Sequence, residues 1–124
     1  MRLLLDTHAF VWWVGDATNL GQRARSAIDD AANEILLSVA SLWELTIKRG
    51  NGKLDFPFDF ETVVNDEGFR VLPISYGHLG ALETLPRLHR DPFDRMLIAQ
   101  AIADDLVLAT RDDRLSAYGV TILW

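Results

Sequence analysis

The sequence contains no cysteine, which excludes disulfide bonds, thiolate metal sites and thiol chemistry. No apolar run approaches the length of a membrane-spanning helix, and the short apolar start meets an acid at residue 6, so no signal peptide is expected. Basic residues are outnumbered by acidic ones, and the net charge of −6 argues against binding nucleic acid through charge alone. We therefore expect a cytoplasmic protein with no membrane partner.

Short apolar runs alternate with helical patterns along the 124 residues, which is enough chain for one domain spanning residues 1–124. Strands are predicted at 2–5, 34–37, 70–74, 106–109 and 120–123, and helices at 9–14, 22–32, 38–49, 61–65, 75–85, 91–103 and 114–118. This alternation predicts an α/β fold in which a mostly parallel sheet of four to five strands lies between helical layers. Right-handed crossovers would bring the carboxyl ends of the strands to one edge.

The segment 91–103 has the most informative pattern. Asp91 is a good N-cap, Pro92 suits the first helical position, and Asp94 falls in the first turn, where an acid complements the helix dipole. From residue 96 onward only Gln100 is polar, which predicts a buried helix. A carboxylate at the start of a buried helix is costly unless a cation or hydrogen-bond donors receive it, so Asp94 is a candidate for function as well as for local helix stability.

Three further acids lie beside predicted strands. Asp6 follows the first strand, Glu44 lies in the helix after the second strand, and Asp112 follows the fourth. Each has a simpler explanation as a helix cap. Glu44 has capping-box spacing with Ser41, although a cap at Ser38 would leave Glu44 with no capping role.

Four acids that converge on one crevice are a more economical explanation than four separate caps. Carboxylates brought within a few ångströms repel one another and cannot all ionise at neutral pH without a cation. Oxygen ligands without thiolates favour Mg²⁺ or Mn²⁺ over zinc, and such a site suits phosphoryl chemistry. The acids therefore predict a divalent-metal site at the carboxyl edge of the sheet, where ligands bind in open α/β folds.

Four motifs in this order resemble those of the PIN-domain family, and specifically its VapC-type ribonuclease toxins. They are Leu3-Leu4-Leu5-Asp6-Thr7-His8, then Ser41-Leu42-Trp43-Glu44-Leu45 followed by Lys48, then the stretch from Asp91 to Ala101, and finally Ala109-Thr110-Arg111-Asp112. The resemblance covers essentially the whole chain. It implies a PIN-like three-layer sandwich and a metal-dependent endoribonuclease that acts as the toxin of a type II toxin–antitoxin pair.

The resemblance also implies roles for individual residues. Asp6 and Asp94 would be the main ligands of Mg²⁺ or Mn²⁺, and Glu44 and Asp112 would complete the site directly or through water. The Thr-x-Asp element favours Asp112 over its neighbour at position 113 and gives Thr110 a supporting role. The family further implies a homodimer and a VapB-type antitoxin that covers the acidic groove.

Basic residues that flank the acids are candidates for contacts with RNA phosphates, although each is also explained as a solvated surface charge. These are Lys48, Arg95 and Arg111, with Arg49, Arg87 and Arg90 as further candidates. His8, His78 and His89 are too scattered to indicate a metal triad and are not assigned. Alternative functions are a PIN-type DNA nuclease and a non-catalytic RNA-binding PIN domain. Phosphoacceptor receiver domains and haloacid-dehalogenase-like phosphatases fit poorly, because the first strand ends in a single acid.

Overall fold

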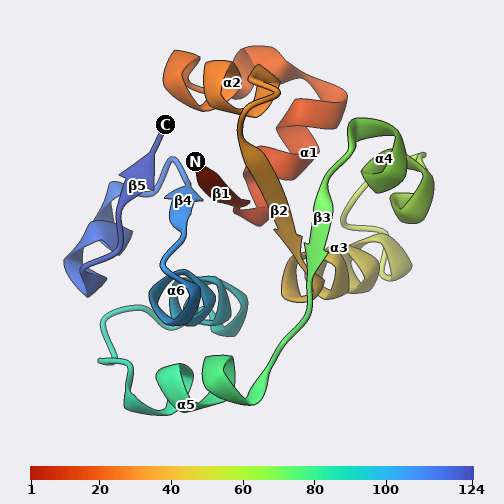
Figure 1. The fold of residues 1–124 in the computed structure, drawn as a ribbon. Coiled ribbons are helices and arrows are strands. Elements are labelled where there is room, and N and C mark those ends of the chain that lie inside the picture. The colour runs from red at the N-terminus through yellow and green to blue at the C-terminus, as the bar shows by residue number, and fades with distance from the viewer.

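The computed structural model describes residues 1–124 and places a five-stranded sheet at the centre of the molecule (Figure 1). The strands are β1 (Arg2–Leu5), β2 (Glu34–Ser38), β3 (Arg70–Leu72), β4 (Val107–Ala109) and β5 (Ile122–Leu123). Their order is β3-β2-β1-β4-β5, and every neighbouring pair is parallel. The predicted parallel α/β sheet is therefore confirmed.

The helices that connect the strands cover both faces of this sheet. They are α1 (Thr7–Gly15), α2 (Gln22–Asp29), α3 (Val39–Gly50), α4 (Phe60–Glu67), α5 (Tyr76–Thr84) and α6 (Pro92–Asp104), with 3₁₀ helices η1 (Ala17–Asn19) and η2 (Asp113–Tyr118). Figure 1 shows α1 and α2 on one side of the sheet and α5 and α6 on the other. None of these helices combines the length and the apolar character that a membrane span requires.

Two elements end earlier than the sequence pattern predicts. Helix α2 stops at Asp29 instead of residue 32, because the side chain of Asp30 accepts a hydrogen bond from the Ala32 N–H and closes a turn. Strand β3 stops at Leu72 because the next residue is Pro73, which has no N–H to donate to the sheet. The 3₁₀ helix η1 has no counterpart among the predicted elements.

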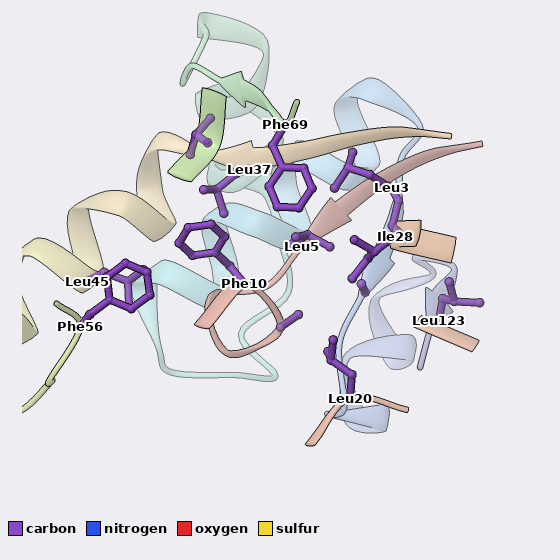
Figure 2. Packing of buried hydrophobic residues seen from close by; sticks show 14 residues of the cluster. Leu3, Leu5, Phe10, Leu20, Ile28, Leu37, Leu45, Phe56, Phe69 and Leu123 are labelled. Atoms are coloured by element: carbon purple, nitrogen blue, oxygen red, sulfur yellow. The ribbon is translucent and has the colours of Figure 1, made fainter. Parts of the chain in front are cut away.

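Side chains that alternate along the strands divide the core into two clusters. Leu3 and Leu5 pack with residues of α1, α2, α3 and α4, whereas Leu4 packs with residues of α6 and η2 on the opposite face. Phe10 of α1 is fully buried in the first cluster, and Figure 2 shows it among Leu5, Leu37 and Phe69. The two clusters make the sheet the middle layer of a three-layer sandwich.

The strand register brings the sites of interest to one edge. Leu5 pairs with Leu37 on one side and with Ala109 on the other, so β1, β2 and β4 end side by side. The N–H of Asp6 donates to the carbonyl of Ala109 at 3.0 Å, which holds the residue after β1 next to Thr110. Functional side chains that follow these strands therefore start from neighbouring positions.

Replacement of Phe10 by alanine tests the importance of the first core cluster. We expect Phe10→Ala to lower the free energy of unfolding by about 3–5 kcal/mol, because it opens a cavity among fully buried side chains. Urea unfolding measures the change, with Phe58→Ala as the matched control because the Phe58 side chain is exposed. Equal losses in the two variants would contradict the packing described here.

Candidate active site

Asp6 is nearly buried at the carboxyl end of β1 and also caps helix α1. Its Oδ1 atom accepts a hydrogen bond of 2.7 Å from the N–H of Ala9. Burial raises the pKa of Asp6, and the nearby Glu44 carboxylate raises it further, while hydrogen bonds from Ala9 and from the Thr110 hydroxyl act in the opposite direction. The structural and the functional explanations of Asp6 are therefore compatible, since the cap holds the carboxylate at the edge of the sheet.

Glu44 is buried and its two carboxylate oxygens have different donors. Oε1 accepts from the Thr7 hydroxyl at 2.7 Å, and Oε2 lies 2.7 Å from the ammonium of Lys48 one helical turn later. The cap of α3 is Ser38, which accepts from the N–H of Ala40 at 3.0 Å, so Glu44 has no capping role. The Glu44 carboxylate contributes to the raised pKa values of both Asp6 and Asp94, which places it within electrostatic reach of them.

Asp91 and Asp94 lie three residues apart but have different roles. Asp91 caps α6 by accepting hydrogen bonds from the N–H groups of Phe93 at 2.8 Å and Asp94 at 3.2 Å, which confirms the predicted cap. The Asp94 carboxylate caps nothing and faces the other acids. Burial, followed by repulsion from Asp91, Asp6 and Glu44, raises the pKa of Asp94 to about 6, although His89 partly offsets the shift.

His89 belongs to the site, although its position in the sequence did not reveal this. Its Nε2 atom lies 3.4 Å from Asp94 Oδ2 and 3.7 Å from Asp112 Oδ2. The Nδ1 atom accepts a hydrogen bond of 3.1 Å from the N–H of Asp91, so in the neutral ring the proton is on Nε2. The ring therefore directs an N–H donor toward the two carboxylates.

Asp112 is paired with an arginine that the sequence pattern also did not assign. Arg114 Nε lies 2.8 Å from Asp112 Oδ1, and Nη2 lies 2.7 Å from Oδ2, which is a bidentate pair. This pair lowers the pKa of Asp112. Thr110 is buried beside it, and its hydroxyl accepts a hydrogen bond from the Asp112 N–H at 3.1 Å.

These residues surround an open pocket of about 420 Å³ at the carboxyl edge of the sheet. It is lined by Asp6, His8, Trp12, His89, Asp94, Thr110, Arg111, Asp112 and Arg114. Glu44 is not part of this lining. Three of the four predicted acids therefore share one pocket, and the fourth acts on it electrostatically.

The predicted substrate-binding residues have different surroundings. Arg111 is exposed at the pocket, with its guanidinium 5.9 Å from the centre of the Trp12 ring. Lys48 is held by Glu44. The Arg95 guanidinium donates to the carbonyls of Pro86 at 2.8 Å and Leu85 at 3.3 Å, so it secures the loop before α6.

The carboxylates fit a hard divalent cation by their chemistry, although no three of the Asp, Glu and His side chains are already placed as a metal cage. The Asp112 carboxylate is turned toward Arg114. Mg²⁺ often takes only one or two protein carboxylates and keeps several waters. Asp6 and Asp94, whose raised pKa values show that their negative charges are poorly compensated, are the pair that a cation would relieve.

Comparisons with known proteins agree with this arrangement. A family model described as "PIN domain" matches residues 3–120. The chain is 27% identical over 119 residues to Ribonuclease VapC22 of Mycobacterium tuberculosis, covering 94% of this chain and 91% of that protein. It is similar in structure to VapBC2 from Rickettsia felis bound to a promoter DNA fragment, with a TM-score of 0.71, 16% identity, and coverage of 99% and 98%. DNA-bound VapBC from Salmonella typhimurium has the same TM-score, 18% identity, and coverage of 99% and 97%.

The raised pKa of Asp94 predicts a stability change that depends on pH. Because the folded pKa of about 6 exceeds the ordinary 3.8, the folded chain binds the proton more tightly, and this contribution to stability is lost as the pH rises through 6. Asp94→Asn should therefore raise the free energy of unfolding of the metal-free chain near pH 8. We expect about 1–2 kcal/mol, after a discount for the solvent-exposed part of the side chain.

Urea unfolding in EDTA near pH 8 and near pH 4.5 measures this change, and the gain should largely disappear at the lower pH. Asp66→Asn is the matched control, because Asp66 is exposed on α4 and makes no ion pair. A loss of stability in Asp94→Asn near pH 8 would contradict the uncompensated charge assigned to this carboxylate.

The adjacent Asp91 should respond in the opposite direction. Asp91→Ala removes the acceptor for two N–H groups at the start of α6 and should cost about 1 kcal/mol of unfolding free energy near pH 4.5. Near pH 8 the loss should be smaller, because Asp94 is then ionised and its repulsion with Asp91 is relieved. Thermal unfolding checks this, with Asp91→Asn as the control that retains a capping oxygen. If the two variants were equally destabilised, the capping role would be wrong.

Proposed function

We propose, from the premise that this chain belongs to the PIN-domain family, that it is a metal-dependent endoribonuclease and the toxin of a toxin–antitoxin pair. The observation that carries the proposal is the pair of acids Asp6 and Asp94. Both have raised pKa values, both lie in one pocket, and burial is the largest cause in each case. A fold that retains two poorly compensated carboxylates loses stability in the absence of a cation, which is understandable if a cation binds there in function.

Asp6 and Asp94 would hold Mg²⁺ or Mn²⁺, and Glu44 and Asp112 would contribute through bound water or after a change of partner. Such an ion supplies Lewis-acid polarisation of a phosphate and activation of water for hydrolysis. Because Asp112 is paired with Arg114 in the free chain, its participation requires that this exposed arginine moves away. Glu44 is the least accessible of the four acids, so we propose that it acts by raising the pKa values of Asp6 and Asp94.

The other polar groups of the pocket position the acids and the substrate. The Thr110 hydroxyl orients Asp6 by hydrogen bonding, and the ammonium of Lys48 neutralises part of the Glu44 charge. His89 presents its Nε2–H between Asp94 and Asp112, where it can donate to a phosphate oxygen. Arg111 and Arg114 are exposed at the mouth of the pocket and supply positive charge to the phosphates that flank the cut.

RNA as the substrate and an antitoxin as the partner are supported by the names of the similar proteins. The curated relative is a ribonuclease, and the similar structures from Rickettsia felis and Salmonella typhimurium are VapBC proteins bound to DNA. We propose a VapB-type antitoxin that covers the acidic pocket and a homodimer of this chain.

The surface supports at least one protein partner. Val39, Trp43 and Ile47 follow one another at intervals of four residues on α3, so they lie on one face of the helix, and all three are exposed. Trp43 packs edge-to-face on Phe93 at the start of α6, with the ring centres 5.1 Å apart. An exposed apolar face beside the acidic pocket is typical of an interaction surface.

Cleavage of a mixed pool of structured RNA by purified, antitoxin-free chain tests the proposed activity. We expect cuts at few positions in Mg²⁺ or Mn²⁺, no cuts in EDTA, and a loss of at least about 100-fold in Asp94→Asn, because that variant lacks a principal ligand. Asp66→Asn, which changes the same chemical group far from the pocket, should cleave like the unmodified chain.

Three outcomes would change the assignment. An Asp94→Asn chain that cleaves normally would overturn the site. Cleavage of a DNA control pool in preference to RNA would replace the ribonuclease with a DNA nuclease. A folded chain that binds Mn²⁺ and RNA but cuts neither polymer would indicate a non-catalytic binding role.

A further inference from the structure

The loop that joins α5 to α6 borders two hollows that differ in the charged residues that line them. The acidic pocket lies on one side of His89. On the other side is a second hollow of about 440 Å³, lined by Arg87, His89, Arg90 and Arg95 and by no acid. His89 therefore lines both the pocket that holds the three aspartates and a hollow whose other lining residues are all arginines.

In the basic hollow, two of the lining side chains are held by hydrogen bonds and the other two have no partner within the chain. The Arg95 guanidinium donates hydrogen bonds to the carbonyls of Leu85 and Pro86 and so fastens the loop to α6. The His89 ring is held by the N–H of Asp91. Arg87 and Arg90 are exposed, and neither makes a hydrogen bond or an ion pair within the chain. Two guanidinium groups without internal partners face a hollow whose walls are held in place.

Because the two hollows adjoin, the backbone of a bound RNA strand is the expected ligand of the basic hollow. A strand of RNA carries a phosphate at every nucleotide, so a strand with one phosphate at the acids must present the next phosphates to the adjoining surface. Guanidinium groups bind phosphate oxygens through charged, often bidentate hydrogen bonds. In a chain with a net charge of −6, such contacts must be local, because long-range attraction to RNA is absent.

We propose that Arg87 and Arg90 form a second phosphate subsite, which binds the backbone phosphate adjacent to the one that is cut. The proposal rests on the proposed function, because it takes the acidic pocket as the place of cleavage. His89 sets the spacing between the two phosphates, and Arg95 holds the loop without contacting RNA. This assignment transfers substrate binding from Arg95, which is already engaged, to the two neighbouring arginines.

The salt dependence of RNA binding tests the subsite without relying on catalysis. The probe is a fluorescently labelled single-stranded RNA oligonucleotide, and its anisotropy is measured at several salt concentrations with Ca²⁺ as the divalent ion. For single strands, each neutralised phosphate contributes about −0.7 to the slope of log K against log salt. The Arg87→Gln/Arg90→Gln chain, which lacks the subsite for one phosphate, should therefore bind more weakly, with a slope shallower by about 0.7.

The matched control is Arg23→Gln/Arg25→Gln, which removes the same two charges from the exposed face of α2, away from both hollows. This control should keep the slope of the unmodified chain, whereas a general charge effect would weaken both double variants equally. Circular dichroism verifies that both fold, as expected for exposed side chains.

Each remaining outcome addresses one proposal. If the unmodified chain binds the oligonucleotide and the two double variants have the same slope, the phosphate subsite is wrong but the proposed ribonuclease stands. If the unmodified chain neither binds nor cleaves RNA, the proposed function itself is overturned, and the subsite with it.

Discussion

Burial of several carboxylates close together at the carboxyl edge of the sheet determines the charge balance of this structure. Burial raises the pKa of both Asp6 and Asp94, the Glu44 carboxylate raises both further, and the Asp6 carboxylate also raises the pKa of Asp94. The fold compensates only in part, through the Ala9 N–H and the Thr110 hydroxyl at one acid and through His89 at the other. The negative charge of these carboxylates is therefore only partly neutralised by the protein, and a bound divalent cation would neutralise the remainder.

The fold holds these acids in place through ordinary helix and strand chemistry. Register pairing of β1 with β4 fixes Asp6 beside Thr110, and the cap at Asp91 fixes the first turn of α6 and hence Asp94. Ser38 caps α3 and leaves Glu44 free to accept from Thr7 and Lys48. From the sequence, capping and function are alternative explanations for these residues. In the structure both hold, because the caps fix the starts of the helices that carry the acids.

The sequence was sufficient to predict features that follow from local patterns. The alternation of apolar runs and helices predicted the parallel sheet, and the resemblance to the PIN-domain family is confirmed by the match over residues 3–120. His89 and Arg114 could not be assigned in this way, because their contacts with Asp94 and Asp112 depend on the path of a loop and on side-chain rotamers. The carbonyl contacts of Arg95 arise for the same reason, since no periodic pattern reports backbone acceptors in an irregular loop.

Calorimetric titration of the chain with Mn²⁺, in two buffers of different ionisation enthalpy, measures both the affinity for the cation and the number of protons released when it binds. A cation that binds the Asp94 carboxylate must displace its proton, so we expect the release of more protons near pH 6 than near pH 8, and weaker binding of Mn²⁺ to Asp94→Asn. If Asp94→Asn leaves the binding of Mn²⁺ unchanged, or if the folded chain does not bind Mn²⁺ at all, a cation site at Asp94 is contradicted.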